Sequence, residues 1–524
     1  MHRLAIAAVT LIGLTGAAFI AAYLLLFSAA TDRAAGLAPA SSAFYLNVYL
    51  QPSTGQQMNL GGLIGRLPGF ADDASLDEKV DQVVQNLLGG TGIDYRAQVK
   101  TWLGDQVAIA GWPSEDDPAT PTAVVIAEVK DRAAADAAVA DLTTEAGSTF
   151  AARTYEGVEL QVGEGSTYAF IGEMLVIGQT AAGVEAIVDV QGGAEALADR
   201  ADFRDTMADL APDHIASVFV DLGAVADATG TGDQLSSVTT AGAALVAEPE
   251  GLRLSGSAPL AVDDASPSAG AGFALGSEPS SLVDWMPEDT IAELIVFGLG
   301  QALEDAEAAA AATPEGQELT GQLDTFRALA AFGLGIDLDA DLLPLLEREV
   351  GIAITGFDGT LPSGQILLRP EDPAAAAATL ERVVDGLTDT LGASASVESI
   401  GDAEITTLSV PDIGDVAFTV TDGIVILGLG TADVAAAIEA HGGGTGLAVT
   451  EAYTRTFDVA GERAGNEAFV HIGAVLDLLG IDTSLPDDAR DILSQVGTFG
   501  FTAPSRNDEI DFHAVLTIDE ARPE

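Results

Sequence analysis

The chain has 524 residues, 48% of them hydrophobic, which is enough for two or more domains that each bury a core. It contains no cysteine, which excludes disulfide scaffolds, cysteine nucleophiles and thiolate metal sites. The formal net charge is −59, from 80 acidic and 21 basic residues, and such a field repels nucleic acids and anionic lipid headgroups. We therefore expect no nucleic acid among its partners.

The excess of acid has two explanations that the sequence leaves open. Lysine occurs only at Lys79, Lys100 and Lys130, while alanine and glycine dominate. A carboxylate-covered surface stays hydrated in concentrated salt, which also screens its self-repulsion. Codon bias in a GC-rich genome gives the same composition. Neither explanation implies a binding function.

An uncharged run of 24 residues extends from Leu4 to Phe27. At about 1.5 Å per residue a helix of this length reaches ~36 Å, enough to cross a hydrocarbon core of about 30 Å. Because His2 and Arg3 precede the run, the positive-inside rule places the N-terminus in the cytoplasm. Cleavage near Ser28-Ala29-Ala30 is the alternative, although the apolar core of a signal peptide usually has about 7–15 residues. The run predicts a single-pass protein of the cell membrane with most of the chain extracytoplasmic and residues 4–27 in contact with the lipid bilayer.

The rest of the chain contains an internal repeat. Phe203 and Thr206 match Tyr453 and Thr456 at an offset of 250, which also relates Phe219-Val220 to Phe469-Val470 and Gly192-Gly193 to Gly442-Gly443. The predicted organisation is a cytoplasmic tip (1–3), a transmembrane signal anchor (4–27), a juxtamembrane linker (28–36), a first copy (37–262), a linker (263–279), a second copy (280–520) and a tail (521–524).

Each copy mixes short strands with helices. Alternation from Phe44 to Gln51 predicts a strand with one buried face, and further strands are expected from Val107, at 122–129 and in a hairpin at 167–178. Asp131 and Asp372 are expected to cap equivalent helices, and a helix at about 181–190 to end at Gly192 in the left-handed conformation. Strands joined by short turns favour an antiparallel α+β sheet over a doubly wound parallel one. The predicted fold class is α+β, with an N-terminal transmembrane helix followed by two tandem copies of an antiparallel-sheet unit.

These features are similar to those of a known family. The anchor, the opening Leu37-Ala38-Pro39-Ala40-Ser41-Ser42-Ala43-Phe44-Tyr45-Leu46 and the later Trp102-Leu103-Gly104-Asp105-Gln106-Val107-Ala108 resemble the uncharacterised bacterial membrane-anchored proteins grouped as domain-of-unknown-function family 3352. The resemblance covers most of residues 37–520. The second copy departs from the pattern with Glu347-Arg348-Glu349, where the first has Gly104-Asp105-Gln106. The family has no established activity, so the resemblance implies no catalytic residue.

Two short motifs suggest ligands, and both have simpler interpretations. Gly428-Leu429-Gly430-Thr431-Ala432-Asp433 resembles a dinucleotide-binding turn but lacks the last glycine and a parallel βαβ context. Asp337, Asp339 and Asp341 resemble the start of a calcium loop, but Leu342 and Arg348 stand where glycine and glutamate are needed. A strand-to-helix turn and an acidic loop leading into a capped helix are the preferred interpretations, with weak surface cation binding as the alternative for the second.

The histidines provide no metal motif. His2, His214, His441, His471 and His513 are too scattered for a zinc site. In the repeat, Asp221 stands opposite His471 and Ser255 opposite His513, which favours tolerated surface or strand-end positions over a duplicated active centre. Tyr45 and Tyr49 share one strand face, where packing under a helix is preferred over lining a groove. The sequence therefore predicts no catalytic, cofactor-binding or metal-binding residue, and no cofactor.

The favoured function is non-catalytic binding of an envelope protein or a small-molecule ligand by a membrane-tethered extracytoplasmic protein, with a cleft between the copies. The first alternative is a structural or assembly role in the cell envelope, which a large exposed apolar patch on one copy would favour. The second is a hydrolase, which a pocket holding acids of perturbed pKa in only one copy would favour.

Overall fold

The chain divides into two units, unit 1 (Met1–Leu260 and Glu520–Glu524) and unit 2 (Ala261–Asp519). The computed structural model describes residues 32–51, 53–67, 78–79, 81–82, 85, 93–114, 121–145, 149–229, 239–259, 278–311, 314–333, 335–358, 361–401, 403–410, 414–479, 493–506 and 509–520. Within these ranges no helix is long and apolar enough to cross a membrane. The anchor predicted at residues 4–27 lies outside them.

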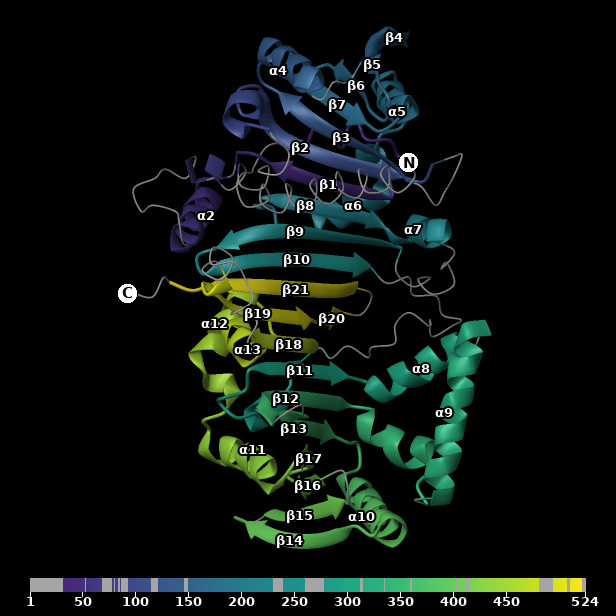
Figure 1. Ribbon diagram of the computed structural model, residues 1–524, viewed down its shortest axis with the longest axis vertical. Coiled ribbons are helices and arrows are strands. Elements are labelled where there is room, and N and C mark those ends of the chain that lie inside the picture. The colour runs from purple at the N-terminus through teal and green to yellow at the C-terminus, as the bar shows by residue number, and fades with distance from the viewer. Residues whose placement is uncertain are drawn as a thin grey trace. The chain divides into compact units, whose positions relative to one another are not determined.

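The described strands of unit 1 form an antiparallel sheet in the order β4-β5-β6-β7-β3-β2-β1-β8-β9-β10 (Figure 1). The strands are β1 (Phe44–Tyr49), β2 (Leu103–Trp112), β3 (Thr122–Val129), β4 (Ala151–Tyr155), β5 (Val158–Val162), β6 (Thr167–Ile171), β7 (Met174–Gly178), β8 (Ala216–Asp221), β9 (Thr240–Glu248) and β10 (Gly251–Pro259). The helices are α2 (Thr54–Arg66), α4 (Arg132–Glu145), α5 (Ala181–Gln191), α6 (Ala201–Ala208) and α7 (Leu222–Thr229), with short π or 3-10 helices η1 (Tyr95–Val99) and η2 (Leu197–Asp199).

Unit 2 has the corresponding order β14-β15-β16-β17-β13-β12-β11-β18-β19-β21, with the short β20 paired to β21. The strands are β11 (Ala292–Phe297), β12 (Glu349–Asp358), β13 (Leu361–Arg369), β14 (Ser394–Ile400), β15 (Ala403–Val410), β16 (Gly414–Thr421), β17 (Ile424–Gly428), β18 (Asn466–His471), β19 (Val496–Ala503), β20 (Ser505–Arg506) and β21 (Glu509–Ile518). The helices are α8 (Leu299–Ala311), α9 (Pro314–Gly333), α10 (Pro373–Leu391), α11 (Thr431–Gly443), α12 (Glu451–Ala460) and α13 (Ile472–Leu479), with short π or 3-10 helices η4 (Leu282–Trp285), η5 (Leu338–Leu342), η6 (Leu343–Leu346) and η7 (Leu447–Val449). The predicted antiparallel α+β architecture is confirmed.

One face of each sheet, here called the inner face, carries the main core. In unit 1 the inner-face core includes Tyr45 and Phe219 from the sheet and Ile187 and Phe203 from α5 and α6. In unit 2 it includes Ile426 and Phe469 from the sheet with residues of α11 and α12, such as Val434 and Tyr453. The opposite face of each sheet is called the outer face. Since side chains alternate along a strand, the covering helices fix which residues point outward.

In each unit, one helix packs closely against a strand at a glycine. A Cβ at Gly242 of β9 would lie 2.6 Å from Thr206 Cγ2 of α6, and a Cβ at Gly500 of β19 would lie 2.4 Å from Thr456 Cγ2 of α12. The threonine hydroxyls also pair with the strands, since Thr206 Oγ1 and Thr240 Oγ1 are 3.0 Å apart and Thr456 is bonded to Thr498 in the same way. Glycine is required at both positions because any side chain would push the helix off the sheet.

Asp131 and Asp372 begin helices as predicted, since each side chain accepts hydrogen bonds from backbone N–H groups in the first turn of α4 or α10. The helix α5 ends at Gly192 as predicted, but the predicted left-handed conformation of Gly192 is wrong, because its φ is −73° and the residue with positive φ is Gly193. In unit 2 the helix α11 continues through residues 442–443 and ends at Gly444 with φ +61°.

The strand predicted at Phe44 has both faces buried, and not one. It lies between β2 and β8 near the middle of the sheet, and Leu46, Asn47 and Val48 are all buried. The packed part of unit 1 also begins before residue 37, because Ala34 and Ala35 belong to its core.

Replacing Gly500 by alanine should lower the free energy of unfolding of unit 2 by about 1–3 kcal/mol, because the added methyl group displaces α12 from β19. Urea titration at fixed salt measures the change. The control is Gly442→Ala in α11, where a Cβ meets nothing within 4 Å and the helix gains propensity. Equal effects of the two substitutions would contradict the packing described here.

Candidate functional site

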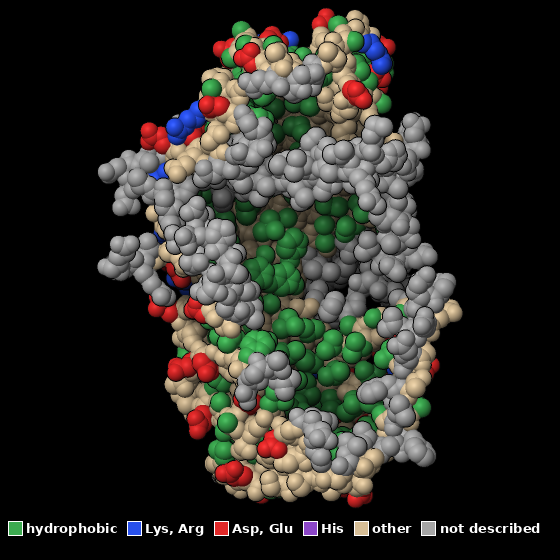
Figure 2. Space-filling model, viewed as in Figure 1, with side chains coloured by type: hydrophobic (Ala, Val, Ile, Leu, Met, Phe, Trp, Pro, Cys, Tyr) green, Lys and Arg blue, Asp and Glu red, His purple; other side chains and the backbone are tan. Residues whose placement is uncertain are grey.

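The outer face of unit 2 carries a row of apolar side chains across neighbouring strands. Leu427 of β17 pairs with Ile366 of β13, Ile366 with Ile352 of β12, and Ile352 with Leu294 of β11. The row continues to Ala468 of β18. Three of these side chains remain open to solvent, with exposed fractions of 43% for Leu294, 36% for Ile352 and 45% for Ile366. Figure 2 shows hydrophobic side chains gathered over these strands.

Part of this face is covered by other elements of unit 2. A second cluster joins Val350, Leu368 and Val425 of the strands to Leu345 of η6 and Leu380 of α10. These strand residues lie two positions along from the exposed row, on the same face. The cover therefore ends beside Ile352 and Ile366. Leu294, Ile352 and Ile366 form an open apolar surface, here called the outer patch together with Leu427, which is half-buried at its edge and packs against the covering cluster.

Unit 1 has the same row with less exposure. The corresponding residues are Leu46, Ile109, Val125 and Ile177, which share one register across β1, β2, β3 and β7. Leu46 is buried, Ile109 and Val125 are half-buried, and Ile177 alone of the four is an exposed large side chain. This row therefore has three exposed large side chains in unit 2 and one in unit 1.

Unit 2 is also strongly acidic, with no lysine, eight arginines and 45 acidic residues. Five of the arginines are engaged in ion pairs: Arg327 with Glu307, Asp324 and Asp339, Arg369 with Glu349, Arg382 with Asp341, Arg455 with Asp519 and Arg463 with Glu467. Unit 2 thus combines an open apolar patch with a strongly negative charge.

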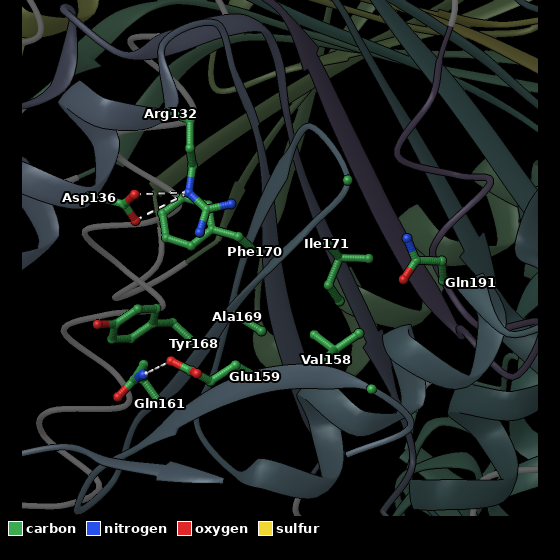
Figure 3. Close-up of a pocket in the computed structure, with 12 residues that line it drawn as sticks. Arg132, Asp136, Val158, Glu159, Gln161, Tyr168, Ala169, Phe170, Ile171 and Gln191 are labelled. Carbon is green, nitrogen blue, oxygen red and sulfur yellow. Dashed lines mark hydrogen bonds and ion pairs between the residues drawn. The ribbon is translucent and has the colours of Figure 1, made fainter. Parts of the chain in front are cut away.

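A cavity of about 360 Å³ lies in unit 1, between α4 and the strands β5 and β6 (Figure 3). The Arg132 guanidinium stacks over the Phe170 ring at 3.6 Å and pairs with Asp136 at 3.2 Å. Burial, with the nearby Asp136 and Glu159, raises the pKa of Tyr168, so that hydroxyl stays protonated at neutral pH. Arg132 and Asp136 pair with each other, while Glu159 accepts a hydrogen bond from Gln161 Nε2 at 2.8 Å.

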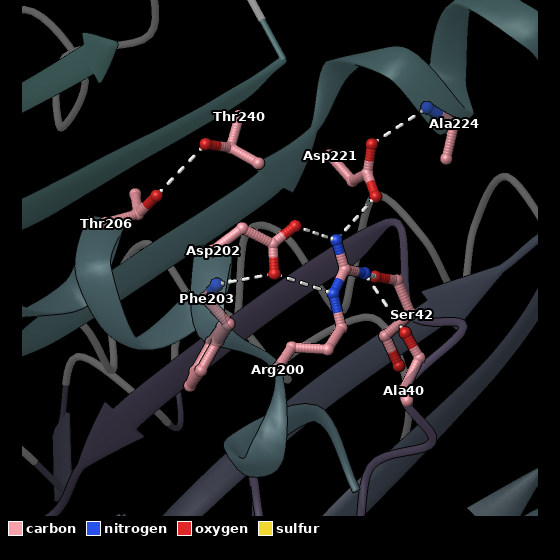
Figure 4. Close-up of polar contacts among 9 residues, drawn as sticks. All are labelled: Ala40, Ser42, Arg200, Asp202, Phe203, Thr206, Asp221, Ala224 and Thr240. Carbon is pink, nitrogen blue, oxygen red and sulfur yellow. Dashed lines mark hydrogen bonds and ion pairs between the residues drawn. The ribbon is translucent and has the colours of Figure 1, made fainter. Parts of the chain in front are cut away.

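Arg200 connects the segment before β1 to the helices α6 and α7 of unit 1. Its guanidinium donates to the carbonyl oxygens of Ala40 and Ser42 at 3.0 and 3.2 Å and to the carboxylates of Asp202 and Asp221 (Figure 4). Asp221 in turn accepts from the N–H of Ala224 at 2.8 Å in the first turn of α7. This cluster is structural, because every charged group in it is paired within the fold.

The positions Asp221 and His471, which the repeat sets opposite each other, have the same structural role. His471 Nδ1 accepts from the N–H of Ala474 at 3.2 Å, so each side chain caps the helix that follows its strand. His214 bonds Ala211 O and packs on Tyr49, while His441 stacks on Trp285 at 3.9 Å. His513 lies on β21 opposite Thr502, and His2 lies outside the described residues. The histidines described are not gathered into one site.

The glycine turn after β17 is a strand-to-helix turn, as preferred. Leu429 N donates to Asp433 at 3.0 Å, and a Cβ at Gly428 would lie 2.5 Å from the Asp433 Cβ. The neighbours of β17 are both antiparallel, so no parallel βαβ unit surrounds the turn. Glycine at position 428 leaves the space that the Asp433 side chain occupies.

The Asp337, Asp339 and Asp341 carboxylates have separate partners. Asp337 caps η5 by accepting from two backbone N–H groups, Asp339 pairs with Arg327, and Asp341 pairs with Arg382. The described part of the chain contains no group of three or more potential metal ligands. The predicted capped helix is therefore confirmed, and the three carboxylates form no shared cation site.

Tyr45 packs under a helix, as preferred, and its ring meets the Phe203 ring of α6 edge to face at 5.8 Å. Its hydroxyl donates to Asp32 at 2.7 Å. Burial, followed by the charge of Asp32, raises the pKa of Tyr45, and burial raises the pKa of Tyr49 to about 12. Neither tyrosine lines a groove.

Unit 2 contains a buried acidic cluster that the sequence interpretation missed. Glu293 of β11 and Glu467 of β18 lie on the inner face of the sheet. Each directly precedes a residue of the apolar row on the outer face, Leu294 or Ala468. Tyr453 donates a hydrogen bond to Glu467, and Arg463 pairs with Glu467 at 2.7 Å. Both carboxylate oxygens of Glu293 are buried without a hydrogen-bond partner in the described structure. Burial, and then the charge of Glu467, raises the pKa of Glu293 well above its usual value. The available signal was a glutamate between Ile291 and Ile295, at an inward position of a strand.

Comparison with known proteins identifies the family. A family model described as "Protein of unknown function (DUF3352)" matches residues 4–516. The chain belongs to this family. The resemblance seen at residues 37–46 and 102–108 is thereby confirmed, and the DUF3352 description assigns no activity and no functional residue. No curated protein matches the chain.

Solved structures similar to this DUF3352 protein include crystal forms IV, I and III of TP0453, which are 8%, 10% and 11% identical to it. The matches cover 43%, 48% and 46% of this chain and 79%, 89% and 85% of those chains, with TM-scores of 0.24, 0.25 and 0.23. TM-scores this low support no argument about this DUF3352 protein.

The buried Glu293 predicts a pH-dependent stability. The pKa of Glu293 is higher in the folded state than in the unfolded state. The free energy of unfolding is therefore undiminished below the pKa of the unfolded state, and it falls as the pH rises through the pKa of the folded state. Glu293→Gln removes this loss, so the variant should exceed the wild type in stability at neutral and alkaline pH, and the gain should shrink toward acid. Urea titrations from pH 4 to pH 9 measure it. Glu304→Gln, at an exposed position on α8, is the control. Parallel pH profiles of wild type and Glu293→Gln would refute the assignment.

Proposed function

We propose that this DUF3352 protein is a membrane-tethered extracytoplasmic protein that binds another envelope protein through the outer patch of unit 2, without catalysis. In this proposal the two units are copies of one antiparallel α+β unit, of which the second keeps an open apolar face for docking.

The observation that supports the proposal is the exposure of the outer patch. Monomeric soluble proteins rarely leave large contiguous apolar surface open, and where they do the surface usually binds a partner. Leu294, Ile352 and Ile366 lie on three adjacent strands and are each more than a third exposed. Burying the exposed part of such side chains is worth roughly 25 cal/mol per Å², so a partner gains affinity from each.

An exposed apolar patch in one unit is the feature expected of a protein that docks on another envelope protein in a structural or assembly role. It gives no support to binding of a small-molecule ligand. The cavity in unit 1 contains an Arg132–Asp136 ion pair, and its lining gives no specific support to a hydrolase. The buried Glu293 and Glu467 of unit 2 belong to its core and not to an open pocket.

Tethering rests on the uncharged run at residues 4–27. Four residues separate Phe27 from Asp32, where the described part of unit 1 begins. Five chain steps of at most about 3.6 Å allow a separation below about 20 Å. Tethering of this kind would keep unit 1 near the membrane surface, where envelope partners are concentrated.

Crosslinking in intact membranes tests the proposal. The full chain should sediment with membranes, and one or a few proteins should crosslink to it reproducibly. Ile366→Asn should reduce recovery of those proteins about tenfold, because the apolar contact is lost without any change of charge. Quantitative mass spectrometry of the crosslinked material is the measurement.

The control is Val449→Asn in η7, an exposed apolar position of unit 2 away from the outer patch. Its crosslinked partners should match those of the wild type. Recovery of the chain in the soluble fraction would contradict the tether, and partners that Ile366→Asn leaves unchanged would contradict docking at the outer patch.

A further inference from the structure

We infer that the partner segment bound by the outer patch is an amphipathic helix with an apolar stripe flanked by lysine and arginine. This inference rests on the proposed function and adds the chemistry of the ligand. Two properties of unit 2 support it, the dimensions of the patch and the charge of its surroundings.

The outer patch has the width of one helix. Leu427, Ile366, Ile352 and Leu294 lie on four neighbouring strands. Adjacent strands are about 4.8 Å apart, so the row spans about 14 Å. A helix with its side chains is about 10–12 Å across and presents residues i, i+3, i+4 and i+7 along one stripe. The three exposed side chains, on three adjacent strands, span about 10 Å of this row, so one helix laid along the strands is about as wide as the exposed part of the patch.

Three helices of unit 2 add exposed carboxylates to its surface. Glu304 on α8, Asp385 on α10 and Asp477 on α13 are exposed and have no ion-pair partner in the described structure. α10 packs on the outer face through Leu380, Leu299 at the start of α8 packs on the same cluster, and α13 packs against β18 and β19. Cations on the partner would be attracted to these groups.

The negative charge of unit 2 also disfavours two other partners of an apolar face, a second copy of the chain and an anionic lipid surface. A second copy would bring its own 45 acidic residues against the same unit, which opposes face-to-face pairing. Anionic lipid headgroups meet the same repulsion. A cationic amphipathic segment gains from the field that repels both, and its association should weaken as salt screens the attraction.

Two fluorescent model peptides test the inference on the full chain in phosphatidylcholine nanodiscs. One is an 18-residue helix of leucine and lysine with leucine along one stripe, and the other has glutamate in place of every lysine. Binding is followed by fluorescence anisotropy, with empty nanodiscs subtracted. The lysine peptide should bind at least tenfold more tightly than the glutamate peptide at 0.15 M salt, and more weakly at 1 M salt.

Charge-neutral variants separate the patch from general attraction to an acidic protein. Ile352→Asn with Ile366→Asn should weaken binding of the lysine peptide about tenfold or more, while Val449→Asn should leave it unchanged. Circular dichroism melts establish that each variant is folded. If the double variant fails to fold, Leu294→Asn alone takes its place, with an expected loss of severalfold.

Several results would overturn the inference. Equal binding of both peptides, or lysine-peptide binding that the patch variants do not weaken, would remove the basic helix as occupant. Self-association of the wild type in analytical ultracentrifugation that the double variant abolishes would identify a second copy instead. Flotation of the chain lacking residues 1–31 with phosphatidylcholine vesicles, lost in the double variant, would identify lipid. In each case a patch-dependent partner in the crosslinking experiment would leave the proposed function standing without the inferred helix.

Discussion

Packing of helices on the inner face of each sheet is the interaction on which the rest of this structure depends. In unit 2, α11 and α12 bury Ile426, Phe469 and their neighbours, and the contact of Thr456 with Gly500 sets how closely α12 approaches. Since side chains alternate along every strand, burying this set turns Leu294, Ile352 and Ile366 outward together. A slip of one residue in any strand would exchange the two sets, so the open face is as strictly determined as the core.

The buried polar groups of the two units show how one arrangement accommodates different residues. In unit 1 the inner position of β1 is Tyr45, whose hydroxyl meets the carboxylate of Asp32. In unit 2 the corresponding position of β11 is Glu293, and the tyrosine comes from α12 as Tyr453, bonded to Glu467. Both units thus bury a tyrosine with a carboxylate at this place, but unit 2 adds a second acid that has no hydrogen-bond partner in the described structure. That acid costs stability at neutral pH, because burial opposes its charged form.

Much of the architecture could be predicted from the sequence, because local patterns specify it. Alternation placed the strands at Thr122–Val129 and the hairpin after Thr167, and Asp131 and Asp372 marked helix starts. Other features depend on partners far away in the chain. The alternation of β1 indicated one buried face, yet its central place between β2 and β8 buries both. The outer patch could not be predicted either, because Ile366 and Leu367 look alike in sequence and only the helices decide which is covered. The Glu293 cluster could not be predicted for the same reason, because tertiary contacts bring its members together. A single acid at an inward-facing strand position was the one sign of it in the sequence.

The outer face of unit 2 is open while its inner face is closed, and the absence of cysteine allows a direct measurement of this difference. Ile366→Cys and Leu367→Cys each introduce one thiol, at adjacent residues that are 45% and 0% exposed. Reaction with a water-soluble maleimide, compared with the rate in denaturant, reports access at each position. Ile366→Cys should be labelled rapidly and Leu367→Cys at least a hundredfold more slowly, in variants that melt cooperatively. Equal protection of the two thiols would contradict this expectation, because the face proposed to bind the partner would then be closed.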